Sequence, residues 1–302
     1  MNKGWIYEEQ VSKTEAGLTL IEYYTQKYSH SGPSEWLERI QSGQILIDGC
    51  SQDPQTLLQP GQKLTYHRPP WEEPEVPLSF EVFYEDDEVL VVAKPSLLPV
   101  LPGGGFLEHT LLSLLQQQYP QRTPIPVHRL GRGTSGLVLL ARSPHARANL
   151  TEQMRSHQVG KIYRALVGSG NIPDHFVITH PIGKIPHPVL GYVFGATADG
   201  MKAYSECHVL KRNPTTTLVE VKILTGRPHQ IRIHLAVAGY PLIGDPLYQI
   251  GGVPRIPEPI AGEKLPVPGD GGYHLHAYGL SFFHPVTGKL IELICPPPTP
   301  LI

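Results

Sequence analysis

The chain has 302 residues, of which 40% are hydrophobic and 17% charged, so it can form one large domain or two smaller ones with a buried core. Its longest apolar runs fall far below the roughly 20 residues that a membrane span needs, and its N-terminus lacks the apolar stretch of a secretion signal. Three widely spaced cysteines exclude a disulfide framework or a thiolate zinc site. These features predict a cytoplasmic protein with no membrane partner.

The net charge of −2 conceals an uneven distribution along the chain. Residues 1–90 hold 16 acidic side chains against 6 Lys and Arg, whereas residues 91–302 hold 11 acidic side chains against 19. The densest basic window, residues 122–164, has eight Lys and Arg and a single acid, Glu152. A basic body behind an acidic head favours a polyanionic partner for the body over a merely solvated surface.

In chain order, residues 1–68 predict a small α+β domain. The segment SGPSEWLERIQSGQILIDG predicts an N-cap at Ser34, a short helix stopped by Gly43, and a strand that ends in an Asp-Gly turn. The apolar face of that helix is expected to carry Trp36, Leu37 and Ile40. The proline-rich, acidic stretch that follows cannot continue as a helix or a central strand, so we assign residues 69–78 to a linker.

Residues 79–302 predict a second, larger domain in which strands and helices mix without a βαβ rhythm. Helices are expected at residues 107–118, at SPHARANLTEQMRSH with Ser143 as its cap, and at PHQIRIHLAVAG, closed by Gly239. Residues 251–272 are rich in Pro and Gly and predict a loop. The predicted strands are LSFEVFYEDDEVLVVAKP (two), SGLVLLA, KIYRALVGSG, AYSECHVLKR, TTLVEVKILTG, and a final pair in HLHAYGLSFFHP and KLIELICPP. We therefore expect the α+β class, with a mixed, mainly antiparallel sheet and flanking helices.

Five segments occur in an order that resembles the RluA-type family of RNA pseudouridine synthases: YEDDEVLVVAKP, PVHRLGRGTSGLVLLAR, KIYRALVGSG, TGRPHQIRIHLAVAGYPLIGDPLY and HLHAYGLSFFHPVTGK. Residues 15–68 are similar to the alpha-L RNA-binding motif. The resemblance implies isomerisation of uridine to pseudouridine in structured RNA, without a cofactor or metal. We expect ribosomal or transfer RNA as the partner, and a monomer because nothing in the sequence demands a partner subunit. Because a paired base is inaccessible, the nucleotide must be flipped out.

The resemblance also implies roles for individual residues. Tyr163 matches the tyrosine that stacks on the target uracil, and Arg227 matches the arginine that pairs with the catalytic acid. Arg129 matches the arginine that enters the space of the flipped base or holds its phosphate, and His128 matches a structural histidine. Further RNA contacts are expected from Arg132, Thr134, Ser135, Lys161, His229, Gln230 and Arg232. For Thr134 and Ser135, organising the turn before the strand is the first expectation.

Gly131 stands where the family places its catalytic aspartate. The work of the missing carboxylate could pass to another acid, to water with Arg227, or to nothing, which would leave a non-catalytic RNA-binding protein or RNA chaperone. The acids considered are Asp245, which also matches a loop-supporting aspartate, and the weaker candidates Asp199 and Glu206. Because the other motif positions are intact, we expect an enzyme. We also expect Gly131, Gly133 and Gly136 to adopt positive φ and cradle a phosphate.

Two other classes of protein are weaker alternatives. GRGTSG lacks the Gly-Lys-Ser/Thr ending of a nucleotide-binding P-loop. A metal hydrolase could use His274, His276 and His284, but no acidic partner lies close to them in sequence. Lys94 is expected at a strand end, either beside the cleft or in solvent. The central expectation is that Tyr163, Arg129 and Arg227 line one groove.

Overall fold

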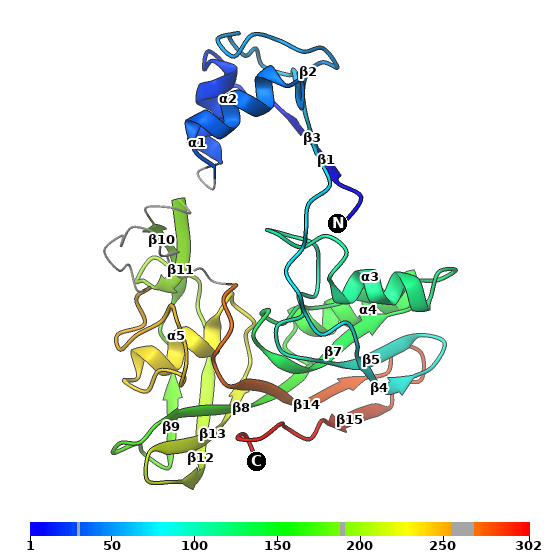
Figure 1. Ribbon diagram of the computed structural model, residues 1–302. Coiled ribbons are helices and arrows are strands. Elements are labelled where there is room, and N and C mark those ends of the chain that lie inside the picture. The colour runs from blue at the N-terminus through cyan, green and yellow to red at the C-terminus, as the bar shows by residue number, and fades with distance from the viewer. Residues whose placement is uncertain (29–30, 188–190, 255–268) are drawn as a thin grey trace. The chain divides into compact units, whose positions relative to one another are not determined.

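The computed structural model describes residues 1–28, 31–187, 191–254 and 269–302 (Figure 1). The chain divides into two compact units, one of Met1–Glu73 with Pro186–Tyr192 and the other of Pro74–Ile185 with Val193–Ile302. Within the described ranges, no helix has both the length and the apolar character required to cross a membrane.

The first unit packs two helices on a three-stranded antiparallel sheet. Its elements are β1 (Trp5–Gln10), α1 (Leu20–Lys27), α2 (Pro33–Gln41), β2 (Ile45–Ile47) and β3 (Lys63–Arg68), with the strand order β1-β3-β2. Trp36 and Ile40 of α2 are fully buried against Leu20, Tyr24 and Leu64. The expected Asp-Gly turn is confirmed, because Asp48 and Gly49 both have positive φ.

The start of helix α2 and one of its apolar contacts differ from the prediction. The N-cap is Gly32 rather than Ser34, because Pro33 supplies the first helical residue and the Glu35 carboxylate accepts a hydrogen bond from the Gly32 amide. Leu37 is 36% exposed, so the buried stripe is narrower than the sequence pattern indicates. Gly43 ends the helix as expected, with a φ of 73°. Strand β1 and helix α1 were not among the predicted elements.

The second unit is built on a ten-stranded sheet with the order β4-β5-β7-β14-β8-β13-β12-β9, to which β15 adds beside β14 and β6 beside β7. The pairing of β7 with β14 is parallel and the other recorded pairings are antiparallel, which confirms the α+β class with a mainly antiparallel sheet. Its strands are β4 (Glu81–Glu85), β5 (Val89–Lys94), β6 (Ile125–Pro126), β7 (Ser135–Ala141), β8 (Gly160–Gly168), β9 (His175–Ile178), β12 (Ser205–Arg212), β13 (Thr216–Ile223), β14 (Leu275–Phe283) and β15 (Leu290–Ile294). Strands β10 (Ile182–His187) and β11 (Gly191–Ala196) form a separate pair.

Three helices complete this unit: α3 (Leu111–Gln118), α4 (Pro144–Arg155) and α5 (Gln230–Val237). Strands β5 and β7 are buried on both faces, which explains their nearly continuous apolar sequences. Side chains of one parity, such as Leu90, pack with Leu111 of α3 and Ile231 of α5, whereas the alternate ones, such as Val91, pack with Leu150 of α4. The two largest hydrophobic clusters of the second unit therefore lie on opposite faces of one sheet.

The predicted helices occur, with boundaries that local capping explains. Helix α4 begins at Pro144, and the Ser143 hydroxyl accepts from the Ala146 amide, as expected. Helix α3 begins at Leu111 instead of residue 107, because Thr110 caps it. Helix α5 begins at Gln230 because His229 adopts a left-handed conformation. The central part of the predicted loop 251–272, residues 255–268, lies outside the described residues.

The parallel pairing of β7 with β14 depends on Gly136. Its φ is 105°, and a Cβ atom at this position would lie 2.3 Å from the carbonyl oxygen of Ala277. Glycine is therefore required at the last position of the Thr-Ser-Gly motif so that the two backbones can approach. This close approach fixes the loop before β7, residues 128–134, beside the segment that precedes β14.

Candidate active site

A cavity of about 600 Å³ lies within the second unit, where segments from distant parts of the sequence meet. Tyr163, Arg129 and Arg227 all line it, so the central geometric expectation holds in the structure. The other predicted site residues on its wall are His128, Gly131, Arg132, Thr134, Lys161, His229, Gln230 and Arg232. Ser135 is not part of the lining, since it starts β7 and its hydroxyl lies 2.8 Å from Nδ1 of His276.

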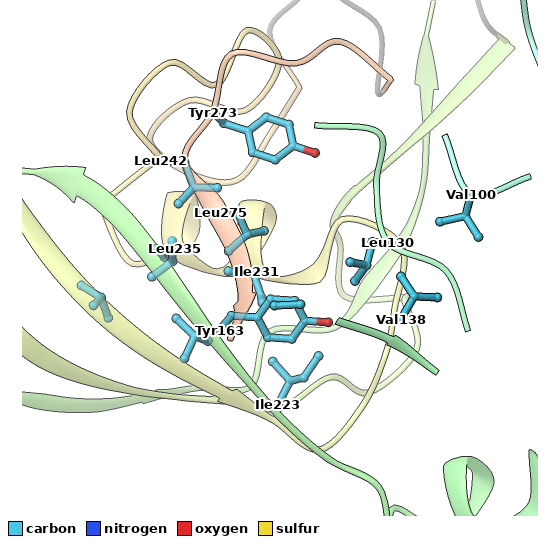
Figure 2. Packing of buried hydrophobic residues seen from close by; sticks show 14 of the residues in the cluster. Val100, Leu130, Val138, Tyr163, Ile223, Ile231, Leu235, Leu242, Tyr273 and Leu275 are labelled. Atoms are coloured by element: carbon cyan, nitrogen blue, oxygen red, sulfur yellow. The ribbon is translucent and has the colours of Figure 1, made fainter. Parts of the chain in front are cut away.

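Tyr163 belongs to β8, between Val221 of β13 and Ala277 of β14. Figure 2 shows its ring among the apolar side chains of Ile223 and Ile231, below the ring of Tyr273. Only 7% of its surface is exposed, and burial raises the pKa of its hydroxyl. The neutral ring thus forms an aromatic wall of the cavity, which is suited to stacking on a planar base.

Basic side chains surround this aromatic wall. Arg129 is exposed, whereas Lys161 is 7% exposed and burial lowers its pKa. Arg132 is held in place, because its Nε donates to the Gly269 carbonyl at 2.6 Å and its Nη2 lies 3.8 Å from the Asp270 carboxylate. The cavity therefore combines an exposed arginine with positive groups that are buried or held by hydrogen bonds, which suits phosphate binding.

Of the two arginines at the α5 side of the cavity, Arg232 is the one that pairs with an acid among the residues that the structure describes. Its Nε and Nη2 donate to the Asp245 carboxylate at 2.7 and 2.8 Å, and the two side chains are 3% and 1% exposed. Arg227 instead donates through Nε to the Lys202 carbonyl at 3.0 Å. The carboxylate pairing expected of Arg227 is thus made by Arg232, with an acid outside the cavity.

None of the three acids considered as substitutes for Gly131 lines the cavity. Asp245 also accepts hydrogen bonds from the backbone amides of Leu247 and Tyr248, at 2.9 Å each. Both of its carboxylate oxygens therefore accept hydrogen bonds within the protein, and the side chain supports the loop. Asp199 lies in an exposed turn. Glu206 lies on strand β12, where its Oε1 is 3.1 Å from Nε2 of His175 on β9. The expectation of a replacement acid among these three is therefore wrong, because the fold gives each of them another place.

The histidines and the glutamine of the motifs are committed to the scaffold. His128 accepts from the Leu139 amide through Nε2, and burial lowers its pKa to about 4. His229 contacts the Tyr248 hydroxyl through Nδ1 at 2.8 Å, and burial lowers its pKa to about 4 as well. Gln230 donates to the Tyr204 carbonyl and accepts from the Arg227 amide. At neutral pH these side chains shape the wall but carry no charge.

Lys94 is neither solvated nor free to reach a ligand. It is 1% exposed, and its ammonium donates to the carbonyl oxygens of Pro95, Leu98 and Arg132 at 2.8, 2.7 and 3.2 Å. Burial lowers its pKa to about 7, whereas the three carbonyl acceptors favour the charged form. Lys94 therefore ties the segment after β5 to the loop that carries Arg132.

Glycine is required in the Gly-Arg-Gly loop because a side chain would clash with or crowd a neighbouring ring, and not because the backbone there has positive φ. Among Gly131, Gly133 and Gly136, the last alone has positive φ. A Cβ atom at Gly133 would lie 2.8 Å from the ring of Tyr273, and one at Gly131 would lie 3.0 Å from its hydroxyl oxygen. The expected positive φ is therefore wrong for Gly131 and Gly133 and confirmed for Gly136, and an aromatic ring covers the loop. Phosphate binding by this loop stays a prediction. Tyr273 was missed in the sequence, where the only signal was its position in the Gly-Gly-Tyr segment beside the HLHA motif.

A possible metal site lies elsewhere. Among the residues that the structure describes, His175, Glu206 and His208 form the one group whose ligand atoms all lie within 4.8 Å of one another. Histidine and glutamate are common zinc ligands, so this group could hold a divalent ion at the β9–β12 edge of the sheet. The histidines of the hydrolase alternative do not form such a group, since His276 contacts Ser135 and His284 contacts Asp86.

Comparisons with known proteins identify the fold. One similar solved structure is titled Human RNA Pseudouridylate Synthase Domain Containing 1. It superposes with a TM-score of 0.55 at 22% sequence identity, and the match covers 74% of this chain and 86% of that one. A second structure, titled Human RNA Pseudouridylate Synthase Domain Containing 4, has the same TM-score at 24% sequence identity. The match covers 72% of this chain and 89% of that one. These structures share the mixed, mainly antiparallel architecture that positions the cavity.

Sequence comparisons extend over nearly the whole chain. The RNA pseudouridylate synthase family profile matches residues 88–237. An uncharacterized RNA pseudouridine synthase of Synechocystis sp. is 50% identical over 94% of this chain and 95% of its own length. RNA pseudouridine synthase 5 of Oryza sativa subsp. japonica is 40% identical over 98% of this chain and 88% of its own length. These findings do not favour the non-catalytic alternative, and the chain belongs to the RNA pseudouridine synthase family as an isomerase of the RluA type.

Proposed function

We propose that this RNA pseudouridine synthase flips a uridine out of structured RNA into the cavity of the second unit and rejoins its base through carbon. The observation that carries the proposal is the meeting of Tyr163 with Arg129, Arg132, Lys161 and Arg227 around a single space of about 600 Å³. An extruded nucleotide needs an aromatic wall for its loose base and cations for its flanking phosphates.

Each of these groups has a separate task in the proposal. Tyr163 stacks on the uracil while the base is detached from the sugar, an interaction worth about 1–3 kcal/mol. Arg129, which is exposed at the rim, holds the backbone or fills the place that the base has left. Lys161 lies deeper and neutralises charge inside the cavity. Arg132 and Arg227 fix the RNA strand on either side.

The RNA is proposed to be ribosomal or transfer RNA, because enzymes of this kind recognise shape and loops rather than long sequences. One relative, a ribosomal large subunit pseudouridine synthase D of Neisseria meningitidis, is 36% identical over 90% of this chain and 72% of its own length. That similarity supports ribosomal RNA as the first substrate to test. We also propose that the protein acts in the cytoplasm, as its composition and its cysteine spacing suggest, and that it acts as a monomer.

The test is conversion by the purified full chain of ribosomal and transfer RNA that lack pseudouridine. Nucleoside mass analysis after digestion measures the pseudouridine formed in each fraction. The proposal expects stoichiometric conversion of one or a few uridines in one fraction and a much lower yield in the other. Absence of pseudouridine in both fractions, with intact and folded protein, contradicts it.

A further inference from the structure

The hydroxyl of Tyr273 occupies the space that a side chain at position 131 would fill. A Cβ atom built on Gly131 would lie 3.0 Å from the Tyr273 hydroxyl oxygen and 3.5 Å from Oγ1 of Thr134. Such a contact is tighter than most Cβ contacts in proteins, so a side chain at position 131 would require the Tyr273 hydroxyl to shift by a few tenths of an ångström. The phenol oxygen therefore stands about where the carboxylate expected at position 131 would be.

The surrounding glycines are shaped for this ring. A Cβ atom on Gly133 would lie 2.8 Å from Cζ of Tyr273 and 3.1 Å from the Cα of Gly271. Hence the Gly-Arg-Gly sequence and Tyr273 form one complementary unit, although 140 residues separate them in the chain. The absence of side chains at positions 131 and 133 is what lets the tyrosine reach the cavity.

The Tyr273 side chain is held as a reactive group would need to be. It lines the same cavity as Tyr163, with 5% of its surface exposed. Its hydroxyl lies 3.3 Å from Oγ1 of Thr134, and the guanidinium carbon of Arg232 lies 4.3 Å from the centre of its ring. In Figure 2 the hydroxyls of Tyr163 and Tyr273 point toward the same side, where Leu130 lies. The hydroxyl contact and the guanidinium beside the ring hold the Tyr273 side chain in one position on the cavity wall.

Carboxylates compete poorly for this role among the described residues. Asp270 follows the lining residue Gly269 but does not line the cavity itself. Its side chain is 40% exposed and lies 3.8 Å from Nη2 of Arg132. This position suits a partner for Arg132 at the rim rather than a group at the sugar.

We propose that Tyr273 is the catalytic residue that acts at the ribose of the flipped uridine in place of a carboxylate at position 131. This assignment rests on the proposed function and names the group that carries out its chemistry. Tyrosine serves as the nucleophile of some glycoside-cleaving enzymes, so a phenol is competent for this chemistry.

The step balances without any further reactant. The Tyr273 oxygen forms a bond to C1′ of the ribose, the C1′–N1 bond breaks with its electron pair going to N1, and the phenol proton passes to N1. The freed uracil turns on Tyr163. Its C5 then bonds to C1′, the oxygen–C1′ electron pair returns to Tyr273, and the C5 proton restores the phenol. The product keeps the proton on N1, as pseudouridine does.

The first test replaces only the hydroxyl, as Tyr273→Phe, in the full chain. The ring packing is kept, so the expected result is normal folding and RNA binding with pseudouridine formation reduced about 1000-fold or more. Tyr240→Phe is the matched control, since its hydroxyl donates to the Asn171 carbonyl and lies outside the cavity lining. Thr134→Val removes the hydroxyl partner alone and should cost far less than Tyr273→Phe.

A second test exchanges the two groups. Gly131→Asp alone should gain no activity, because the Tyr273 hydroxyl already fills the space beside position 131. The double variant Gly131→Asp with Tyr273→Ala should be at least about 10-fold more active than Tyr273→Ala, because a carboxylate then fills the phenol's place. Wild-type activity retained by Tyr273→Phe overturns the assignment and leaves the proposed function intact. A wild-type enzyme that forms no pseudouridine overturns the proposed function itself, and this assignment with it.

Discussion

Arg232 and Asp245 show how one buried ion pair orders the wall of the cavity. The pair is bidentate and almost fully buried, and the same carboxylate accepts two backbone amides of the following loop. Arg232 also lies beside the rings of Tyr248 and Tyr273, at 4.9 and 4.3 Å. Burial of the positive charge of Arg232 is therefore compensated by the ion pair with Asp245.

We predict that Asp245→Asn destabilises the second unit by about 3–5 kcal/mol, because it leaves the Arg232 charge unpaired in a buried place. Urea-induced unfolding followed by circular dichroism measures the change. Glu152→Gln is the control, since it breaks an exposed pair with Arg155 and should cost no more than about 1 kcal/mol. Equal unfolding curves for the two variants would contradict this account of the pair.

At the scale of elements, the loop before β7 is fastened from both sides. Lys94 of β5 binds the Arg132 carbonyl, and His128 accepts from the Leu139 amide of β7. Lys94→Met should therefore destabilise the fold by about 3 kcal/mol or more, because it removes the ammonium donor of the Pro95 and Leu98 carbonyl oxygens and one of the two donors to the Arg132 carbonyl oxygen. Thermal unfolding compared with Lys211→Met, an exposed strand position, checks this prediction. Melting at the same temperature as that control would refute it.

His128 also predicts how stability depends on pH. Its folded pKa is lowered to about 4 from an ordinary value of 6.5, so the unfolded chain binds more protons between these values. The stability that it contributes is complete above about pH 6.5 and is lost as the pH falls through about 4. His128→Gln keeps an acceptor without a titrating ring, so its unfolding free energy should fall less steeply from pH 7 to pH 4.5. Parallel slopes in urea titrations of variant and wild type would count against this role.

The elements themselves were largely predictable, and the contacts between distant elements were not. Alternation in KIYRAL places Tyr163 on a strand, and Ser143-Pro144 marks a helix start, because both signals are local. The pairing of Gly131 with Tyr273 has no local signal, since it depends on the parallel approach of β7 and β14. Lys94 likewise looks exposed in sequence, and three carbonyl groups fixed by the fold explain its burial.

At the scale of the whole molecule, the charge asymmetry along the sequence favours the second unit as the part that binds RNA. In the first unit, Lys27 lies between Glu9 and Glu15 at 3.0 and 2.9 Å, and Lys63 lies 2.8 Å from Glu8. Because acids already neutralise these lysines, we expect the first unit, with its alpha-L-like sequence, to contribute little to the affinity for RNA.

We predict that a fragment of residues 1–73 binds RNA at least about 100-fold more weakly than the full chain at physiological salt. Filter binding across a salt series measures both affinities and their salt slopes. The full chain should show the steeper slope, since its cavity and basic surface neutralise more phosphates. Tight, salt-sensitive binding by the fragment would contradict the assignment.

The central claim is that Tyr163, Arg129 and Arg227 hold one flipped uridine in the cavity of the second unit. The most direct measurement is the pseudouridine yield, by nucleoside mass analysis, of Arg129→Gln, Tyr163→Leu and Arg227→Gln beside the exposed control Arg155→Gln. Each cavity variant is expected to form pseudouridine about 10-fold or more slowly in a single turnover, whereas the control forms it at the wild-type rate. Cavity variants that convert uridine as fast as Arg155→Gln would contradict it.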